Sequence, residues 1–101
     1  YEALAPHGVR TPYWGPLSGA YATVGGALSQ NSLFHGSGTG GTAAESVIGL
    51  KVVLADGTTV TTGSWAHKHS KPFWRHFGPD MTGLFTADTG AMGVKAVAVL
   101  R

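Results

Sequence analysis

Apolar residues run almost unbroken over residues 47–54 and are rich in β-branched side chains. Such a run predicts a buried strand. Asp56 and Gly57 follow it, and because this pair is typical of a type I′ hairpin turn, residues 58–62 are predicted to form the returning strand. Residues 94–100 are again almost entirely apolar and predict a final buried strand.

Short helices are predicted around these strands. Residues 1–8 have the pattern of a helix end, with Gly8 suited to the left-handed position that follows a last turn. Residues 27–33 come after a pair of glycines that release the backbone, and they are predicted to form a second helix. Asp80 is a good N-cap for a third, which continues to Phe85.

The segments between these elements predict loops. Residues 11–19 contain repeated prolines and glycines, and residues 37–42 are almost entirely Gly, Ser and Thr, as in a flexible or ligand-contacting loop. Residues 65–78 form a long segment with no steady period. The order of elements predicts an α+β fold with a mostly antiparallel sheet and short helices.

The composition is that of one small globular domain with few surface charges. A chain of 101 residues can bury a modest core, and three Trp, three Tyr and four Phe are enough to anchor it. Charged residues make up 12%, about half the usual share. This shortfall predicts that a cofactor, another domain or another chain covers part of the surface. A small Gly-rich protein with a plain surface is the alternative.

The charge, the absence of cysteine and the lack of a long apolar run argue against several classes of function. The net charge is +2, and only Lys68, Lys71 and Arg75 approach a cluster, which is too thin for nucleic-acid binding. No cysteine is present, so a disulfide scaffold and a thiolate metal site are excluded, and a cytoplasmic location is favoured. No apolar run approaches ~20 residues, so no membrane span is predicted.

Two Gly-rich segments are candidate ligand sites. Glycine lets backbone N–H groups approach a ligand closely, and N–H groups at a helix start favour a phosphate. Thr23, Gly25, Gly26 and Ser29 could act in this way at the predicted helix start, while a plain turn at the glycine pair is an equally good interpretation. Neither segment matches the G-x-G-x-x-G dinucleotide fingerprint or the phosphate-binding P-loop.

The histidines offer a metal site as another hypothesis. His67 and His69 would share one face of a strand, and His35 or His76 could complete a zinc or iron site. The neighbouring lysines and arginine would repel a cation, so a solvated or interface loop is the preferred interpretation. No G-x-S-x-G nucleophile elbow is present, which argues against a serine hydrolase of that type.

A series of segments, taken in order, resembles a known family. Residues 23–26, 49–57, 78–85 and 89–94 are similar to the vanillyl-alcohol oxidase / p-cresol methylhydroxylase type of FAD-linked oxidases. That superfamily also includes D-lactate dehydrogenases, the glycolate oxidase D subunit and alkyldihydroxyacetonephosphate synthase. The resemblance covers about residues 16–101, and it depends on the ordered set because each segment is weak by itself.

The resemblance implies that residues 1–101 are the C-terminal half of a PCMH-type FAD-binding domain. It places the Gly-rich pyrophosphate loop upstream and a substrate or cap domain downstream, in the rest of the enzyme chain or another subunit. The partners it implies are FAD and a small-molecule substrate held by the cap domain. The implied FAD-binding residues are Ser18, Gly19, Thr23, Gly25, Gly26, Ser29, Gly90, Met92, Gly93 and Val94.

The activity implied is oxidation of an alcohol or 2-hydroxy acid, with hydride transfer to flavin N5. No residue of this chain is a candidate for the substrate base. Thr89 stands where the family usually has Glu, and Gly40-Gly41 where it often has Tyr-Gly. These departures keep a second hypothesis open, namely a non-catalytic binding or scaffold module that kept the fold and lost FAD.

Overall fold

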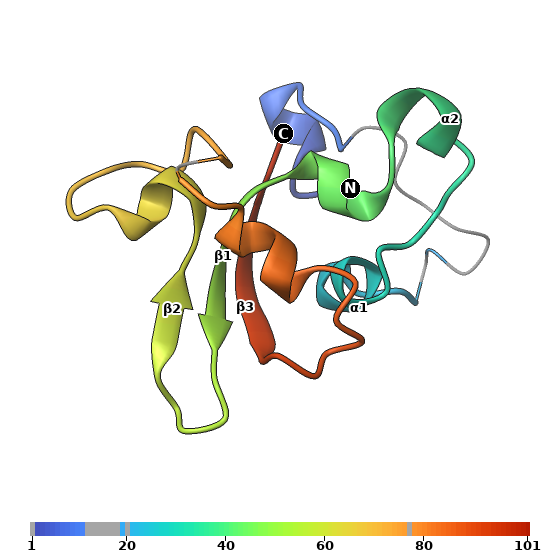
Figure 1. The fold of residues 1–101 in the computed structure, drawn as a ribbon. Coiled ribbons are helices and arrows are strands. Elements are labelled where there is room, and N and C mark those ends of the chain that lie inside the picture. The colour runs from blue at the N-terminus through green and yellow to red at the C-terminus, as the bar shows by residue number, and fades with distance from the viewer. Residues whose placement is uncertain (1, 12–18, 20, 77) are drawn as a thin grey trace.

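The computed structural model describes residues 2–11, 19, 21–76 and 78–101. Its centre is β1 (Val47–Val53), whose Leu50 and Val52 are fully buried. In the described part of the chain the strands form a three-stranded antiparallel sheet in the order β2-β1-β3, with β2 at Thr59–Thr61 and β3 at Val94–Leu100. Figure 1 shows β1 in the middle, between the other two strands. The predicted α+β class and antiparallel pairing are confirmed.

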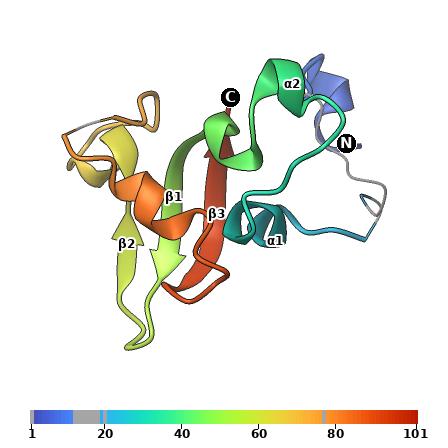
Figure 2. The same ribbon diagram turned by 45° about the vertical axis from the view of Figure 1, so that its right-hand side comes forward.

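Helical elements cover one face and one side of this sheet. A 3₁₀ helix, Met81–Phe85, crosses one face, and α1 (Val24–Ser29) lies beside β3, on the side away from β2 (Figures 1 and 2). Their apolar side chains close over β1. The resulting core consists of Leu28, Phe34, Ala43, Val47, Leu50, Val52 and Phe85.

β3 pairs with β1 as predicted, but it is less buried than its sequence suggests. Val94 is 69% exposed and Val97 is 41% exposed. Val97 pairs with Lys51 of β1, whereas the neighbouring Ala98 pairs with the core residue Leu50. Because successive side chains of a strand point to opposite faces, Val97 lies on the face away from the core. On the core side Ala98 and Leu100 are only partly buried, so the prediction of a buried strand is wrong.

The hairpin turn falls where the sequence places it, but its type differs. Of residues 55–57, all of which the structure describes, only Gly57 has a positive φ, at 84°. The Gly57 amide donates to the Leu54 carbonyl at 3.0 Å, and the Leu54 amide donates to the Thr58 carbonyl at 2.8 Å. This is a three-residue loop, whereas a type I′ turn needs two residues with positive φ. Asp56 stabilises it by accepting the Thr58 amide at 2.8 Å.

The helix predicted at residues 27–33 begins and ends earlier. Thr23 is extended and caps α1, so the paired glycines are inside the helix rather than before it. The helix stops at Ser29, and Asn31 then adopts a left-handed φ of 47°. A second difference is α2 (Ser37–Gly40), a single helical turn where the Gly and Ser content predicted only a loop.

The predictions for residues 1–8 and for the helix that follows Asp80 agree better with the structure. Residues Ala5–His7 form a 3₁₀ helix, and Gly8 follows it in the left-handed conformation, with φ of 66°. Asp80 caps the helix Met81–Phe85 by accepting the Gly83 amide. Tyr1 and most of the loop predicted at residues 11–19 lie outside the described residues.

The long segment after β2 is held by polar side chains. Ser64 is 1% exposed, accepts the amides of Phe73 and Trp74 at 3.0 and 3.2 Å, and donates to the Lys71 carbonyl at 2.8 Å. Ser64 therefore fixes both sides of the loop with one hydroxyl group.

Among the described residues, no helix has the length and apolar character needed to cross a membrane.

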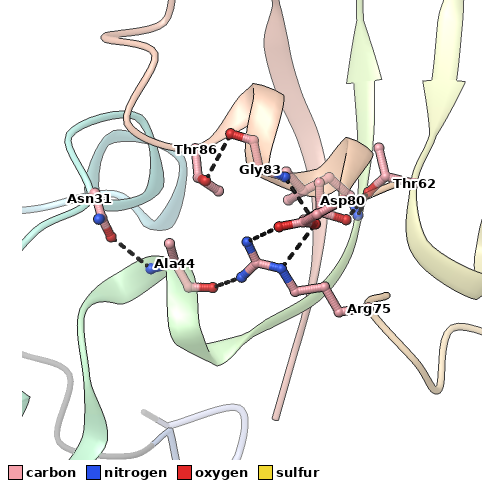
Figure 3. A network of polar contacts seen from close by, with 9 residues as sticks. Asn31, Ala44, Thr62, Arg75, Asp80, Gly83 and Thr86 are labelled. Carbon is pink, nitrogen blue, oxygen red and sulfur yellow. Dashed lines mark hydrogen bonds and ion pairs between the residues drawn. The ribbon is translucent and has the colours of Figure 1, made fainter. Parts of the chain in front are cut away.

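A second polar network joins this segment to the rest of the molecule (Figure 3). The Arg75 guanidinium pairs with Asp80 at 2.8 Å and also donates to the Ala44 carbonyl. The Ala44 amide in turn donates to the Asn31 side chain at 3.0 Å. Arg75 thereby connects the long loop to the Met81–Phe85 helix and to the turn that leads into β1.

Candidate functional site

The structure places the two Gly-rich segments side by side. Their contact is made at the end of α1, where the Leu28 carbonyl accepts the Ala87 amide at 3.0 Å and the Ser29 carbonyl accepts the Thr89 amide at 2.9 Å. Nearer the start of α1, a Cβ atom on Gly25 would lie 3.9 Å from the Lys95 carbonyl oxygen. The predicted segments are thus one structural unit, although they come from opposite ends of the chain.

Thr23 has a specific role in the first segment. Its Oγ1 accepts the Gly26 amide at 3.0 Å, which caps α1. The Gly26 amide therefore already has a partner inside the protein, so Thr23 contributes chiefly by shaping the helix start. Thr23 and Gly26 are exposed, Gly25 and Ser29 are half-buried, and the surface of this segment is accessible.

Removing this cap tests its role. The variant Thr23→Val keeps the shape of the side chain but loses the oxygen that accepts the Gly26 amide. We expect the free energy of unfolding to fall by about 1 kcal/mol, the usual effect of losing an N-cap. Thr23→Ser retains the acceptor and should match the parent protein in urea denaturation. Equal stability of Thr23→Val and Thr23→Ser would contradict the capping role.

The second segment, residues 87–93, is called the Gly loop. It begins in an unusual backbone conformation, because Ala87 and Thr89 have positive φ angles of 58° and 53°. Glycines then follow with φ of 87° at Gly90 and 143° at Gly93. Left-handed conformations are disfavoured for residues with a Cβ atom, so the surrounding structure must hold this loop in place.

Gly93 occupies a position that only glycine fits. A Cβ atom there would lie 2.7 Å from the Val52 Cγ1 atom and 2.7 Å from the Val53 carbonyl oxygen. Both distances are well below van der Waals contact. The missing side chain lets β3 begin directly against β1. The glycine therefore has a packing reason that is independent of any ligand.

Asp88 and Lys95 organise the Gly loop, and sequence reasoning did not select either. The Asp88 carboxylate accepts the amides of Gly90 and Met92, each at 3.0 Å, and pairs with the Lys95 ammonium. Their side chains are only 4% and 3% exposed. One signal was available, since Asp88 is one of only five acidic residues and lies next to a Gly-rich turn.

The electrostatics of this pair favour ionised Asp88. Burial opposes the charge, but the hydrogen bond from Lys95 and those from the Gly90 and Met92 amides outweigh it. Together they hold the pKa of Asp88 below its usual range. The carboxylate is therefore ionised at neutral pH and accepts all of these donors.

Both segments border hollows at the surface. One, of about 390 Å³, is lined at Thr23, Gly26, Ala27 and neighbouring residues up to Leu33. The other, of about 240 Å³, lies between the hairpin start, residues 53–55, and residues 90–94. Among the described residues, the two hollows share no lining residue. Each borders accessible glycine backbone, and in the described part of the chain neither hollow extends from one segment to the other.

The remaining predicted site residues that the structure describes are exposed at the surface. Ser18 lies outside the described residues, and Gly19 is described as an exposed turn residue. Met92 is 49% exposed at the tip of the Gly loop, and Val94 is 69% exposed at the start of β3. Apart from Ser18, the predicted residues are therefore on accessible or half-buried surface. Their contact with a cofactor stays a prediction.

The alternative metal site has no support in the fold. Among the described residues, no group of three His, Asp or Glu side chains is close enough to hold a metal ion. His69 has a left-handed φ of 71°, and the His67 amide donates to the Ser64 carbonyl at 3.2 Å. The His67-x-His69 pattern therefore belongs to a folded loop, not to the strand face that the metal hypothesis required.

Comparison with known proteins supports the family resemblance. The family described as FAD binding domain matches residues 1–63. A probable mitochondrial D-lactate dehydrogenase of Danio rerio is 35% identical over 92 residues, which are 90% of this chain and 18% of that protein. Glycolate oxidase subunit GlcD of Bacillus subtilis (strain 168) is 33% identical over 86 residues, 85% of this chain and 17% of that protein.

These matches have clear bounds. The chain spans less than one fifth of the length of these relatives. The Gly loop lies outside the segment that the family matches, whereas α1 lies within it. Because the family covers more than half of the chain, the chain belongs to the FAD binding domain family, and its cofactor is FAD.

Proposed function

We propose that this chain is the C-terminal half of an FAD-binding domain in a flavin-dependent oxidoreductase that oxidises an alcohol or a 2-hydroxy acid. The observation that carries the proposal is the joining of α1 to the Gly loop through the carbonyls of Leu28 and Ser29. It gives a single unit whose accessible backbone comes from both segments that the family resemblance assigns to FAD. The names of the relatives, a D-lactate dehydrogenase and a glycolate oxidase subunit, support a 2-hydroxy acid as the substrate.

The residues present fit one side of a flavin nucleotide. The exposed backbone at Gly26 and Gly90 lets a cofactor approach closely, because neither residue has a side chain, while their amides already donate to Thr23 and Asp88. Met92 adds an apolar surface. Hollows of about 390 and 240 Å³ border these residues, and neither would enclose a dinucleotide by itself. The proposed role of this chain is therefore to bind and orient, with the remaining contacts made by the rest of the enzyme.

When bound, FAD would supply the hydride acceptor at flavin N5, which is chemistry that amino-acid side chains lack. This chain would hold its part of the cofactor through backbone contacts from α1 and the Gly loop. A rigid contact surface would hold the cofactor in its reacting orientation before the reaction begins, so that no further entropy is lost at the chemical step. The groups that bind the substrate and take its proton are proposed to lie in the other parts of the enzyme.

A purified full-length protein provides the test. We expect it to show the visible absorption bands of flavin, or to acquire them after incubation of the apoprotein with FAD. Under anaerobic conditions, a 2-hydroxy acid such as glycolate should bleach these bands by reducing the flavin. An aromatic primary alcohol is the comparison substrate.

The outcomes separate the two hypotheses. A full-length protein that stays colourless and takes up no FAD would support the non-catalytic module, for which Thr89 is the motivating departure from the family. A protein that binds FAD but is bleached only by the aromatic alcohol would overturn the 2-hydroxy acid and keep the oxidoreductase.

A further inference from the structure

The Gly loop keeps a conformation that its own sequence does not favour. Ala87 and Thr89 are left-handed although both carry a Cβ atom, with φ of 58° and 53°. Hydrogen bonds to α1 fix the amides of these two residues, but they do not reach the part of the loop that contains Gly90 and Met92. Another group must therefore hold the outer half of the loop.

The Asp88 carboxylate is that group. Its Oδ1 atom accepts the Gly90 amide and its Oδ2 atom accepts the Met92 amide, each at 3.0 Å, so one side chain spans the loop. Lys95 reaches back from β3 to the same Oδ1 atom, and its ammonium also lies 3.5 Å from the Gly93 carbonyl oxygen. Asp88 thus holds the amides of Gly90 and Met92, and Lys95 joins Asp88 to the Gly93 carbonyl at the end of the loop.

The pair also connects the loop to α1. The Lys95 carbonyl oxygen faces Gly25, because a Cβ atom there would lie 3.9 Å from it. Lys95 is therefore next to α1 through its backbone and next to the Gly loop through its side chain. Since its side chain is only 3% exposed and that of Asp88 only 4%, neither is available to contact a large ligand directly.

We propose that Asp88 and Lys95 are positioning residues for FAD, which fix the backbone of residues 90–94 against α1 without touching the cofactor. The inference rests on the proposed function of the domain. It adds that a buried ion pair sets the geometry of the cofactor surface. Charge-assisted hydrogen bonds suit this task because they are shorter and stronger than neutral ones.

Variants of the full-length protein test the pair. Asp88→Asn removes the charge and keeps one side-chain acceptor, so part of the loop loses its partner. We expect the dissociation constant for FAD to rise at least tenfold, with a shift in the visible flavin spectrum. Lys95→Met leaves the bonds of Asp88 to the loop amides in place and should weaken FAD binding several-fold. Lys95→Arg retains the positive charge beside Asp88 and should therefore bind FAD more tightly than Lys95→Met.

A matched control is available in the other ion pair. Asp80 pairs with Arg75 and accepts the Gly83 amide (Figure 3). It caps the Met81–Phe85 helix and lies in neither Gly-rich segment. Asp80→Asn should lower the thermal midpoint while leaving the FAD dissociation constant within twofold. All titrations are made well below the unfolding midpoint of each variant, so that lost stability does not appear as lost binding.

The outcomes are distinct. Tighter binding by Lys95→Arg than by Lys95→Met, with Asp80→Asn unchanged, supports the positioning role, even where Asp88→Asn does not fold. If Asp88→Asn and Lys95→Met bind FAD as the parent does and differ only in thermal midpoint, the pair is purely structural and the inference fails. A parent protein that binds no FAD would instead refute the proposed function itself.

Discussion

Replacing Gly93 with alanine is expected to lower the free energy of unfolding by roughly 2–5 kcal/mol. The new Cβ atom would approach the Val52 Cγ1 atom and the Val53 carbonyl oxygen to 2.7 Å each, and the backbone has a φ of 143°. The carbonyl belongs to the central strand and cannot move away as a flexible side chain would. The start of β3 must then separate from β1, and FAD binding should be lost with it.

Gly90→Ala is the matched control for this prediction. Gly90 also has a positive φ, at 87°, but a Cβ atom there would meet no atom of the described residues within 4 Å. It should therefore show only the penalty for an L-residue at positive φ, about 1–2 kcal/mol. Urea denaturation of both variants measures the difference. A cost for Gly93→Ala no greater than for Gly90→Ala would show that the close packing at Gly93 is wrong.

Leu28→Ala is the second change with a large expected effect. Leu28 is fully buried and is the residue of α1 that enters the core, so its truncation should cost about 2–5 kcal/mol. Because the Leu28 carbonyl also accepts the Ala87 amide, a shift of α1 would disturb the contact between the two Gly-rich segments. We expect weaker FAD binding together with the loss of stability.

Leu33→Ala tests whether that effect comes from burial. Leu33 follows α1 closely in the chain but is 70% exposed. Its truncation should change the free energy of unfolding by no more than about 0.5 kcal/mol. The comparison is made by urea denaturation. Similar losses in both variants would mean that α1 is not anchored through Leu28.

Much of the sheet follows from local sequence, because its signals are short-range. β1 is an apolar run interrupted only at Gly49 and Lys51, and most of it is buried as such a run predicts. The sequence places the hairpin turn at Asp56-Gly57 correctly, but its type depends on a hydrogen bond between Leu54 and Thr58 that the dipeptide does not encode. The exposure of Val97 was unpredictable for a similar reason, since it depends on which elements pack on each face.

The candidate site shows the same division. The sequence and the family resemblance identified both Gly-rich segments, and the structure brings them together. The paired glycines suggested a turn before a helix, yet the Thr23 cap draws them into α1. Asp88 and Lys95 were not predicted because an ion pair that joins a loop residue to a strand residue has no local sequence pattern. Its detection needed the positions of the loop amides.

The hydrogen bonds that join α1 to residues 87 and 89 have a consequence for biosynthesis. On the ribosome, α1 emerges well before the segment that completes its partners, and domains generally fold as units. Leu28 has no finished core to enter until β3 has been made. Contacts between distant parts of a chain also form slowly, because the intervening loop must close first. We therefore expect this chain to acquire FAD only after β3 has been translated.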